Sequence, residues 1–256
     1  MPRSHRMLPR RPSTLSGWLL TALAASTAVV AAGFAFVYFE VFATSSPPPL
    51  TLTPQPSTSA AAAQSAAATQ ASVAVTGLAG TWSVANGSVA GYRVREQLAF
   101  LSSPSDAVGR TSSVTGTATL TNAAGNLTVT ATSFTVDVST LTSDRSMRDE
   151  RIRTIGLESD RYPTASFVLT SPITLPASAS TGQQFHVSAV GRLTIHGATK
   201  TETIPLDAQL SGSQIQVVGS ITFPWGDFGM QAPSVGGFVH VTDQATMEFR
   251  LNLQRA

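Results

Sequence analysis

From about Leu78 to the end of the chain, apolar and polar side chains alternate with a period of two. In the last such stretch, apolar Ala245, Met247, Phe249, Leu251 and Leu253 alternate with polar Thr246, Glu248, Arg250, Asn252 and Gln254. Strict alternation is typical of β-strands with one apolar and one wetter face. The same pattern predicts about eight strands: Trp82–Leu98, Val108–Thr121, Leu127–Val138, Ala165–Ser171, Phe185–Ile195, Thr201–Leu210, Ile215–Phe223 and Asp243–Leu253.

Short turns connect several of these strands. Ser211-Gly212-Ser213 and Asn122-Ala123-Ala124-Gly125 have the composition of hairpin loops. The apolar phase slips between Ala131 and Phe134, which a β-bulge would produce. Only the stretch Asp144–Leu157 has a helical character. We therefore expect an all-β domain over residues 77–256: an antiparallel barrel of about eight strands with one short helical segment.

The first 76 residues differ in composition from the rest. Residues 1–14 are basic. Residues 15–42 carry no charge before Glu40 and are mostly apolar, and this segment is long enough for a transmembrane helix. A cleaved signal peptide is the alternative, although such peptides have shorter apolar cores of about 7–15 residues. Residues 43–76 are rich in Pro, Ser, Thr and Ala and predict a disordered linker with a reach of about 30 Å.

This arrangement predicts the location of the barrel. Arginines on the amino-terminal side of the apolar segment favour a cytoplasmic N-terminus, which leaves the barrel outside the cytoplasm. We expect a cell-membrane protein with a single span, or a secreted protein if the segment is cleaved.

Charge and residue usage exclude several classes of function. The chain has 16 Lys and Arg against 14 Asp and Glu. Four of the arginines lie within the first eleven residues, so the remaining chain is close to neutral and nucleic acid is not an expected partner. Cysteine is absent, which excludes disulfides, thiolate metal sites and a cysteine nucleophile. His186 and His240 lack metal-ligand spacing, no catalytic triad stands out, and we expect neither a metal site nor an enzyme.

Three stretches of the sequence resemble the YceI-like family. They are Arg148-Asp149 followed by Tyr162-Pro163-Thr164-Ala165-Ser166-Phe167, then Gly191-Arg192-Leu193-Thr194-Ile195-His196-Gly197-Ala198-Thr199-Lys200, and then Asp227-Phe228-Gly229-Met230. The resemblance implies a lipocalin-like barrel that takes up a polyisoprenoid, such as a quinone with a long tail, and that has no established catalytic residues. The sequence departs from the family pattern at one place. Members of the family often have a histidine soon after the Arg-Asp pair, whereas this chain has Glu150-Arg151-Ile152-Arg153 there.

The apolar stripes supply candidates for a ligand-binding wall. If these stripes face inward, the lining residues are Phe134, Phe167, Leu193, Ile195, Ile221, Phe223, Met247 and Phe249. Each of them would equally suit an ordinary filled barrel core. A filled barrel would make the protein a structural or interaction domain of the envelope, which is the alternative function.

Polar residues at the barrel mouth are the second set of candidates. Arg148 and Asp149 lie on the predicted helical segment among other charges. They form either a solvated face with helical ion pairs or a polar rim that meets a lipid head group. His196 precedes Gly197 in a predicted turn, where it either bonds to the backbone or joins the same rim. The expected ligand is a long-chain isoprenoid lipid bound without any other cofactor.

Overall fold

A computed structural model describes residues 46–53, 77–99, 103–123, 125–233, 237 and 239–256. The predicted basic tail 1–14, the predicted membrane segment 15–42 and residues 54–76 of the predicted linker lie outside the described residues. Within the described ranges, no helix combines the length and the apolar character needed to cross a bilayer.

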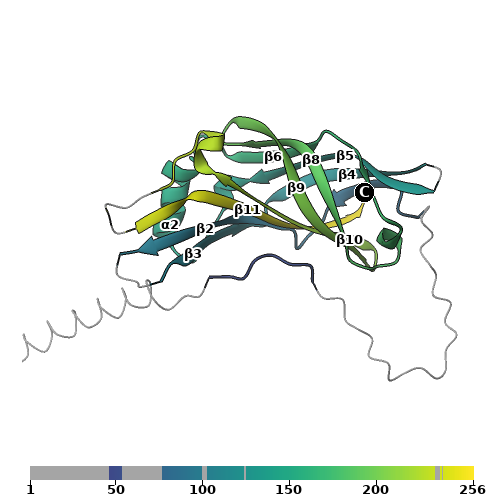
Figure 1. Ribbon diagram of the computed structural model, residues 1–256, viewed down its shortest axis with the longest axis horizontal. Coiled ribbons are helices and arrows are strands. Elements are labelled where there is room, and N and C mark those ends of the chain that lie inside the picture. Colours follow the sequence, from purple (N-terminus) through teal and green to yellow (C-terminus); the bar gives the residue numbers. More distant parts are fainter. Residues whose placement is uncertain (1–45, 54–76, 100–102, 124, 234–236, 238) are drawn as a thin grey trace, which may run out of the picture. The chain divides into compact units, whose positions relative to one another are not determined.

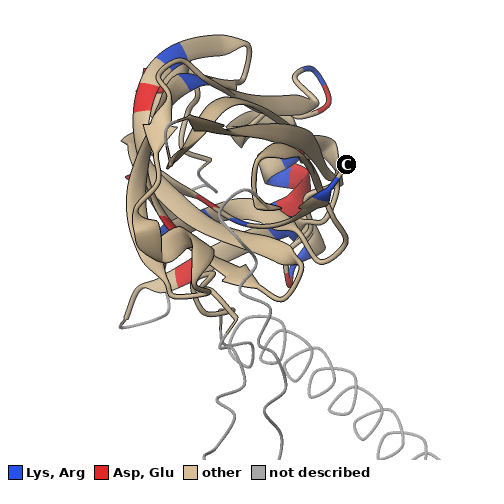
Figure 2. Ribbon diagram, turned by 90° about the vertical axis from the view of Figure 1, so that its right-hand side faces the viewer, with Lys and Arg blue, Asp and Glu red and all other residues tan. Residues whose placement is uncertain are grey.

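The described domain is an antiparallel β-barrel (Figure 1). Its strands are β1 Gly80–Val84, β2 Val89–Leu98, β3 Ser105–Thr111, β4 Val114–Ala123, β5 Asn126–Asp137, β6 Thr164–Leu169, β7 Ile173–Thr174, β8 Phe185–Ile195, β9 Ala198–Ser211, β10 Gln214–Pro224 and β11 Val239–Arg255. Figure 2, turned by 90°, looks along the barrel and shows the strands arranged in a ring.

The barrel closes through β11, the longest strand. Its C-terminal part pairs with β1, where Trp82 lies opposite Arg255, and its earlier part pairs with β2, where Val89 lies opposite Arg250. Because β4 pairs with β1 and β3 pairs with β2, the first two predicted strands are each interrupted once. The two-residue β7 pairs only with β5 and lies off the main path. Without it, and with β1–β2 and β3–β4 each counted as one strand, the barrel is closed and eight-stranded, as the period-two pattern predicts.

One end of the barrel carries the longest helical segment, whereas the 3-10 turn Ala177–Ser180 packs elsewhere, against Phe185 of β8. The α-helix α2, Ser146–Arg151, continues into a single π-helical turn, Ile152–Gly156. The short 3-10 turn Trp225–Phe228 lies at the same end, and Ile152, Trp225 and Phe228 belong to one buried cluster. The helical segment is therefore shorter than the predicted Asp144–Leu157, and it closes this end by burying apolar side chains against the barrel interior.

The predicted bulge lies slightly earlier than expected. Thr119 on β4 is opposite Ala131 on β5, but the next residue, Leu120, is opposite Val129. Thr130 is therefore the extra residue, one position before the predicted slip. Beyond it, Thr132, Phe134 and Val136 again point inward, so the bulge restores the apolar phase of the strand.

Candidate binding cavity

The barrel interior contains an apolar cavity of about 150 Å³. The strands β2, β4, β5, β6, β8, β9, β10 and β11 all contribute side chains to its wall. Apart from Thr132 and Ser166, every lining residue is apolar. An apolar cavity of about this size has too few polar partners to hold ordered water, so it stays dry and accepts apolar molecules.

A smaller cavity of about 60 Å³ lies under the helical cap. It shares Ala90, Val136, Ala165 and Met247 with the wall of the main cavity. The two cavities therefore adjoin along the barrel, one toward the capped end and one in the middle. Both walls are almost entirely apolar.

Most of the predicted lining residues lie on these walls. The main cavity is lined by Phe134, Phe167, Leu193, Met247 and Phe249. The smaller cavity is lined by Ile195, Phe223 and again Met247. Ile221 lines neither cavity and instead packs against the buried cluster near the cap. Sequence reasoning missed other wall positions, such as Ala118, Leu206 and Val217, although the same period-two pattern marks them.

Inward-facing glycines make room for the aromatic rings of this wall. Phe249 lies opposite Gly219 and Phe134 lies opposite Gly116 on the neighbouring strands. A Cβ added to Gly219 would lie 2.5 Å from Phe249 Cζ, and one on Gly116 would lie 2.7 Å from Phe134 Cδ1. The Phe249 ring thus occupies space that a larger residue at position 219 would need. At Gly116 the backbone oxygen of Ser133 is closer still, at 2.2 Å, and the φ of 143° itself favours glycine.

Two further aromatic rings follow the same rule. A Cβ on Gly191 would lie 2.3 Å from Phe167 Cζ, and one on Gly109 would lie 2.3 Å from Tyr92 Cε1. These four glycines are interior positions of strands, where glycine has neither a side chain to pack nor a favourable conformational entropy. Gly109, Gly191 and Gly219 allow an aromatic ring to pack directly against the strand backbone at these positions.

A buried ion pair lies at the capped end. Arg148 from α2 contacts Glu96 of β2, with 2.7 Å between Nη2 and Oε1, and the side chains are only 11% and 7% exposed. Arg148 also pairs with Asp144. Burial opposes the charge of Arg148, but the neighbouring carboxylates outweigh that effect and raise its pKa. Arg148 therefore fastens the helix to the barrel wall and is not a solvated residue.

Tyr92 lies between this ion pair and the smaller cavity. Its ring lines that cavity, and its hydroxyl is buried with no hydrogen-bond partner among the described residues. Burial raises the pKa of Tyr92 well above its ordinary value, so the hydroxyl keeps its proton and can act as a donor. Sequence reasoning missed Tyr92 and Glu96, which the alternation of β2 places on its inward face.

The other two predicted rim residues have structural contacts. Asp149 Oδ1 accepts a hydrogen bond of 2.9 Å from the backbone N–H of Ser143, just before the helix. His196 occupies the turn between β8 and β9 with a φ of 53°, and its Nδ1 lies 3.2 Å from the carbonyl oxygen of Phe228. Neither residue lines either cavity. The described residues also contain no group of three or more His, Cys, Asp or Glu able to hold a metal ion.

Comparisons with known proteins identify a family. The YceI-like domain matches residues 63–253. A polyisoprenoid binding domain from Saccharophagus degradans, implicated in plant cell wall breakdown, has 15% sequence identity and a TM-score of 0.50, over 70% of this chain and 99% of that chain. This similarity shows a shared fold. No curated protein matches the sequence.

Two further solved structures have lower TM-scores. BcnA from Burkholderia cenocepacia has 19% identity and a TM-score of 0.45, over 63% of this chain and 95% of that one. A YceI protein from Campylobacter jejuni has 12% identity and a TM-score of 0.38, over 53% and 79%.

Proposed function

Because the chain belongs to the YceI-like family, we propose that it binds a polyisoprenoid or quinone-type lipid chain inside the barrel, for carriage or storage beside the membrane. The apolar cavity is the observation that carries this proposal. The solved relative from Saccharophagus degradans, described as a polyisoprenoid binding domain, supports the same class of ligand. Binding without chemical turnover suits a wall that presents almost no polar atoms.

The energetics favour a long chain over a short one. Each buried methylene contributes about 0.8 kcal/mol, so two isoprene units with ten carbons contribute roughly 8 kcal/mol. Association costs about 4–15 kcal/mol in lost freedom of motion, which offsets most of that gain. Tight binding therefore requires a chain that extends from the main cavity into the smaller one.

Tyr92 supplies a polar end for this chain. A buried hydroxyl without a partner costs about 1–3 kcal/mol, and a carbonyl oxygen of a ligand would remove that cost. We place the head group of the lipid beside the Tyr92 hydroxyl, under the cap that Arg148 fastens. A quinone carbonyl matches this donor, whereas a plain hydrocarbon end does not.

The location beside a membrane rests on the N-terminal sequence. We propose that residues 15–42 anchor the protein in the cell membrane and that the barrel lies on the extracytoplasmic side. A lipid with a long isoprenoid tail is found in the membrane, so an anchored barrel is close to its ligand.

Mass spectrometry of the full-length protein tests the binding proposal. Protein purified from membranes should release an isoprenoid lipid into organic solvent. Ala118 and Thr117 are neighbours on β4, with Ala118 buried on the cavity wall and Thr117 exposed. The Ala118→Leu variant should lose most of this lipid, whereas Thr117→Leu should retain it. Equal lipid content in both variants, or none in the unaltered protein, contradicts the proposal and favours a filled barrel.

A further inference from the structure

An extended segment upstream of the barrel lies on its outer face. Residues 46–53, Ser-Pro-Pro-Pro-Leu-Thr-Leu-Thr, belong to the sequence expected to form a linker, and we call them the docked segment. At one end, Ser46 donates a hydrogen bond to the carbonyl oxygen of Asp106 on β3. At the other end, Gln209 Nε2 on β9 donates to the carbonyl oxygen of Thr53 over 2.9 Å. The docked segment thus crosses the barrel from β3 to β9.

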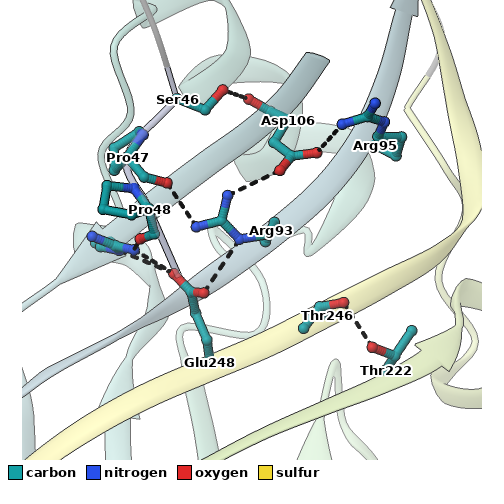
Figure 3. Close-up of polar contacts among 10 residues, drawn as sticks. Ser46, Pro47, Pro48, Arg93, Arg95, Asp106, Thr222, Thr246 and Glu248 are labelled. Atoms are coloured by element: carbon teal, nitrogen blue, oxygen red, sulfur yellow. Dashed lines mark hydrogen bonds and ion pairs between the residues drawn. The ribbon is translucent and has the colours of Figure 1, made fainter. Parts of the chain in front are cut away.

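Two arginines bind its proline-containing part. Arg93 Nη2 donates to the carbonyl oxygen of Pro47 over 2.8 Å (Figure 3). Arg110 Nη2 donates to the carbonyl oxygen of Pro48 over 2.5 Å. Proline has no backbone N–H, so an extended proline run offers only carbonyl oxygens to a partner. A surface that presents charged donors is therefore complementary to this segment, and such hydrogen bonds are stronger than those between neutral groups.

Carboxylates hold these arginines in place. Glu248 on β11 accepts from Arg110 Nη2 over 2.7 Å and lies 3.4 Å from Arg93 Nε. Asp106 lies 3.1 Å from Arg93 Nη1 and also pairs with Arg95. The donors are thus oriented before the segment binds, because each arginine is fixed by a carboxylate on a rigid strand (Figure 3).

The docked segment covers part of the outer face of the barrel. Outward positions on a barrel strand normally face solvent, yet four outward side chains here are buried: Gln209 at 7%, Gln216 at 8%, Val218 at 8% and Glu248 at 3% exposure. Val218 and Glu248 line a groove together with Pro49 and Leu50. Gln216 also donates to Thr53 Oγ1 over 3.2 Å.

We propose that this outer face is a docking site for the chain's own residues 46–53, and that docking holds the barrel close to the membrane. The second part rests on the proposed anchor at residues 15–42. Only residues 43–45 separate that anchor from the docked segment, a span of at most about 11 Å. An undocked linker over residues 43–76 would let the barrel move to about 30 Å from the membrane.

The segment of the same chain is the expected occupant. Residues 54–76 join the docked segment to the barrel, and a covalent connection of this length gives an effective concentration in the millimolar range. A second copy of the protein would have to exceed that concentration to exchange segments. The test must therefore distinguish docking within one chain from docking of a segment that belongs to another copy.

Cysteine labelling tests the docking itself, because the natural chain contains no cysteine. In the full-length protein, Leu50→Cys should react with a water-soluble maleimide at least tenfold more slowly than Ala62→Cys in the linker. Adding Gln209→Ala and Gln216→Ala should remove most of this protection. Thr222→Val is the matched control, because Thr222 is an outward residue of β10 that bonds to Thr246 instead of the segment, and it should change nothing.

Energy transfer tests the consequence for the membrane. The full-length protein, labelled at Thr117→Cys, is placed in vesicles that contain an acceptor lipid. Replacing residues 46–53 by a Gly-Ser repeat of equal length should lower the transfer and leave the bound-lipid content unchanged.

Equal labelling rates for Leu50→Cys and Ala62→Cys would overturn the docking proposal. Concentration-dependent protection of Leu50→Cys would also overturn it, by showing exchange between copies. If Leu50→Cys is protected from the maleimide but the Gly-Ser replacement leaves the energy transfer unchanged, only the proposed effect on the distance to the membrane is overturned. If the unaltered protein carries no extractable lipid, the binding proposal is contradicted but the docking proposal is not.

Discussion

Phe249 on β11 lies directly opposite Gly219 on β10, and its ring occupies the space that a side chain on Gly219 would need. Substituting Gly219 by Ala places a Cβ 2.5 Å from Phe249 Cζ, closer than carbon atoms approach without displacement. The ring should turn into the cavity. We expect Gly219→Ala to reduce the bound lipid several-fold, as measured by mass spectrometry of organic extracts.

Gly226→Ala is the control for this prediction. A Cβ on Gly226 would meet no atom within 4 Å, and the residue needs no positive φ. This variant should keep its lipid. If Gly219→Ala keeps the same lipid content as Gly226→Ala, the glycine does not maintain the cavity.

Tyr92 predicts a preference among head groups. The variant Tyr92→Phe removes the only polar atom of a side chain that already fits its site, so the fold should be retained. It should bind a prenylated quinone roughly tenfold more weakly than the unaltered protein, since the hydrogen bond to the carbonyl is lost. Its affinity for a hydrocarbon of equal length should not fall. A competition assay with the two ligands measures the ratio, and an unchanged ratio would place the head group elsewhere.

The ion pair of Arg148 and Glu96 predicts a non-additive effect on stability. Arg148→Met leaves Glu96 as a buried charge without its partner and should lower the free energy of unfolding by about 3–5 kcal/mol. The double variant Glu96→Met with Arg148→Met removes both charges and should recover most of that loss. Urea denaturation of the unaltered protein, the single variant and the double variant measures the free energy of unfolding of each.

Arg153 provides a comparison on the same helical segment. It forms ion pairs with Glu150 and Asp160, but its side chain and theirs are largely exposed. Arg153→Met should leave the urea midpoint unchanged, because solvent weakens exposed ion pairs. A loss as large as that of Arg148→Met would contradict the role assigned to burial.

Asp106 predicts part of the acid sensitivity. Burial opposes its ionisation, but hydrogen bonds from Arg95 and Arg93 prevail and hold the pKa of this carboxyl below its usual range. Its folded-state pKa is therefore below the unfolded value of about 3.9, so the stabilisation is present above that pH and is lost as the pH falls through the folded value. Asp106→Asn should lower stability at pH 7 by about 0.2–1 kcal/mol and flatten the decline in stability below about pH 4. Urea midpoints across this range provide the measurement, and parallel curves would contradict it.

The alternation of residue types predicted much of this fold correctly. Six predicted strands each lie on one observed strand and the first two each lie on two, because a period of two leaves a single way to turn apolar side chains toward one interior. The same reasoning placed Phe134, Phe167, Leu193, Met247 and Phe249 on a common wall. The pattern failed only in details: the bulge at Thr130, the shorter helix and the position of Ile221.

The sequence by itself determined which face of each strand is apolar, because that property depends on neighbours two residues apart. The tertiary structure decided whether those faces enclose an empty space, since that depends on which residue lies opposite which. Gly219 is an unremarkable strand residue until the register sets it under Phe249. Arg148 is one charge among many until the fold brings Glu96 to it, 52 residues away in the chain. The same holds for Pro47 and Arg93, which only the folded barrel brings together.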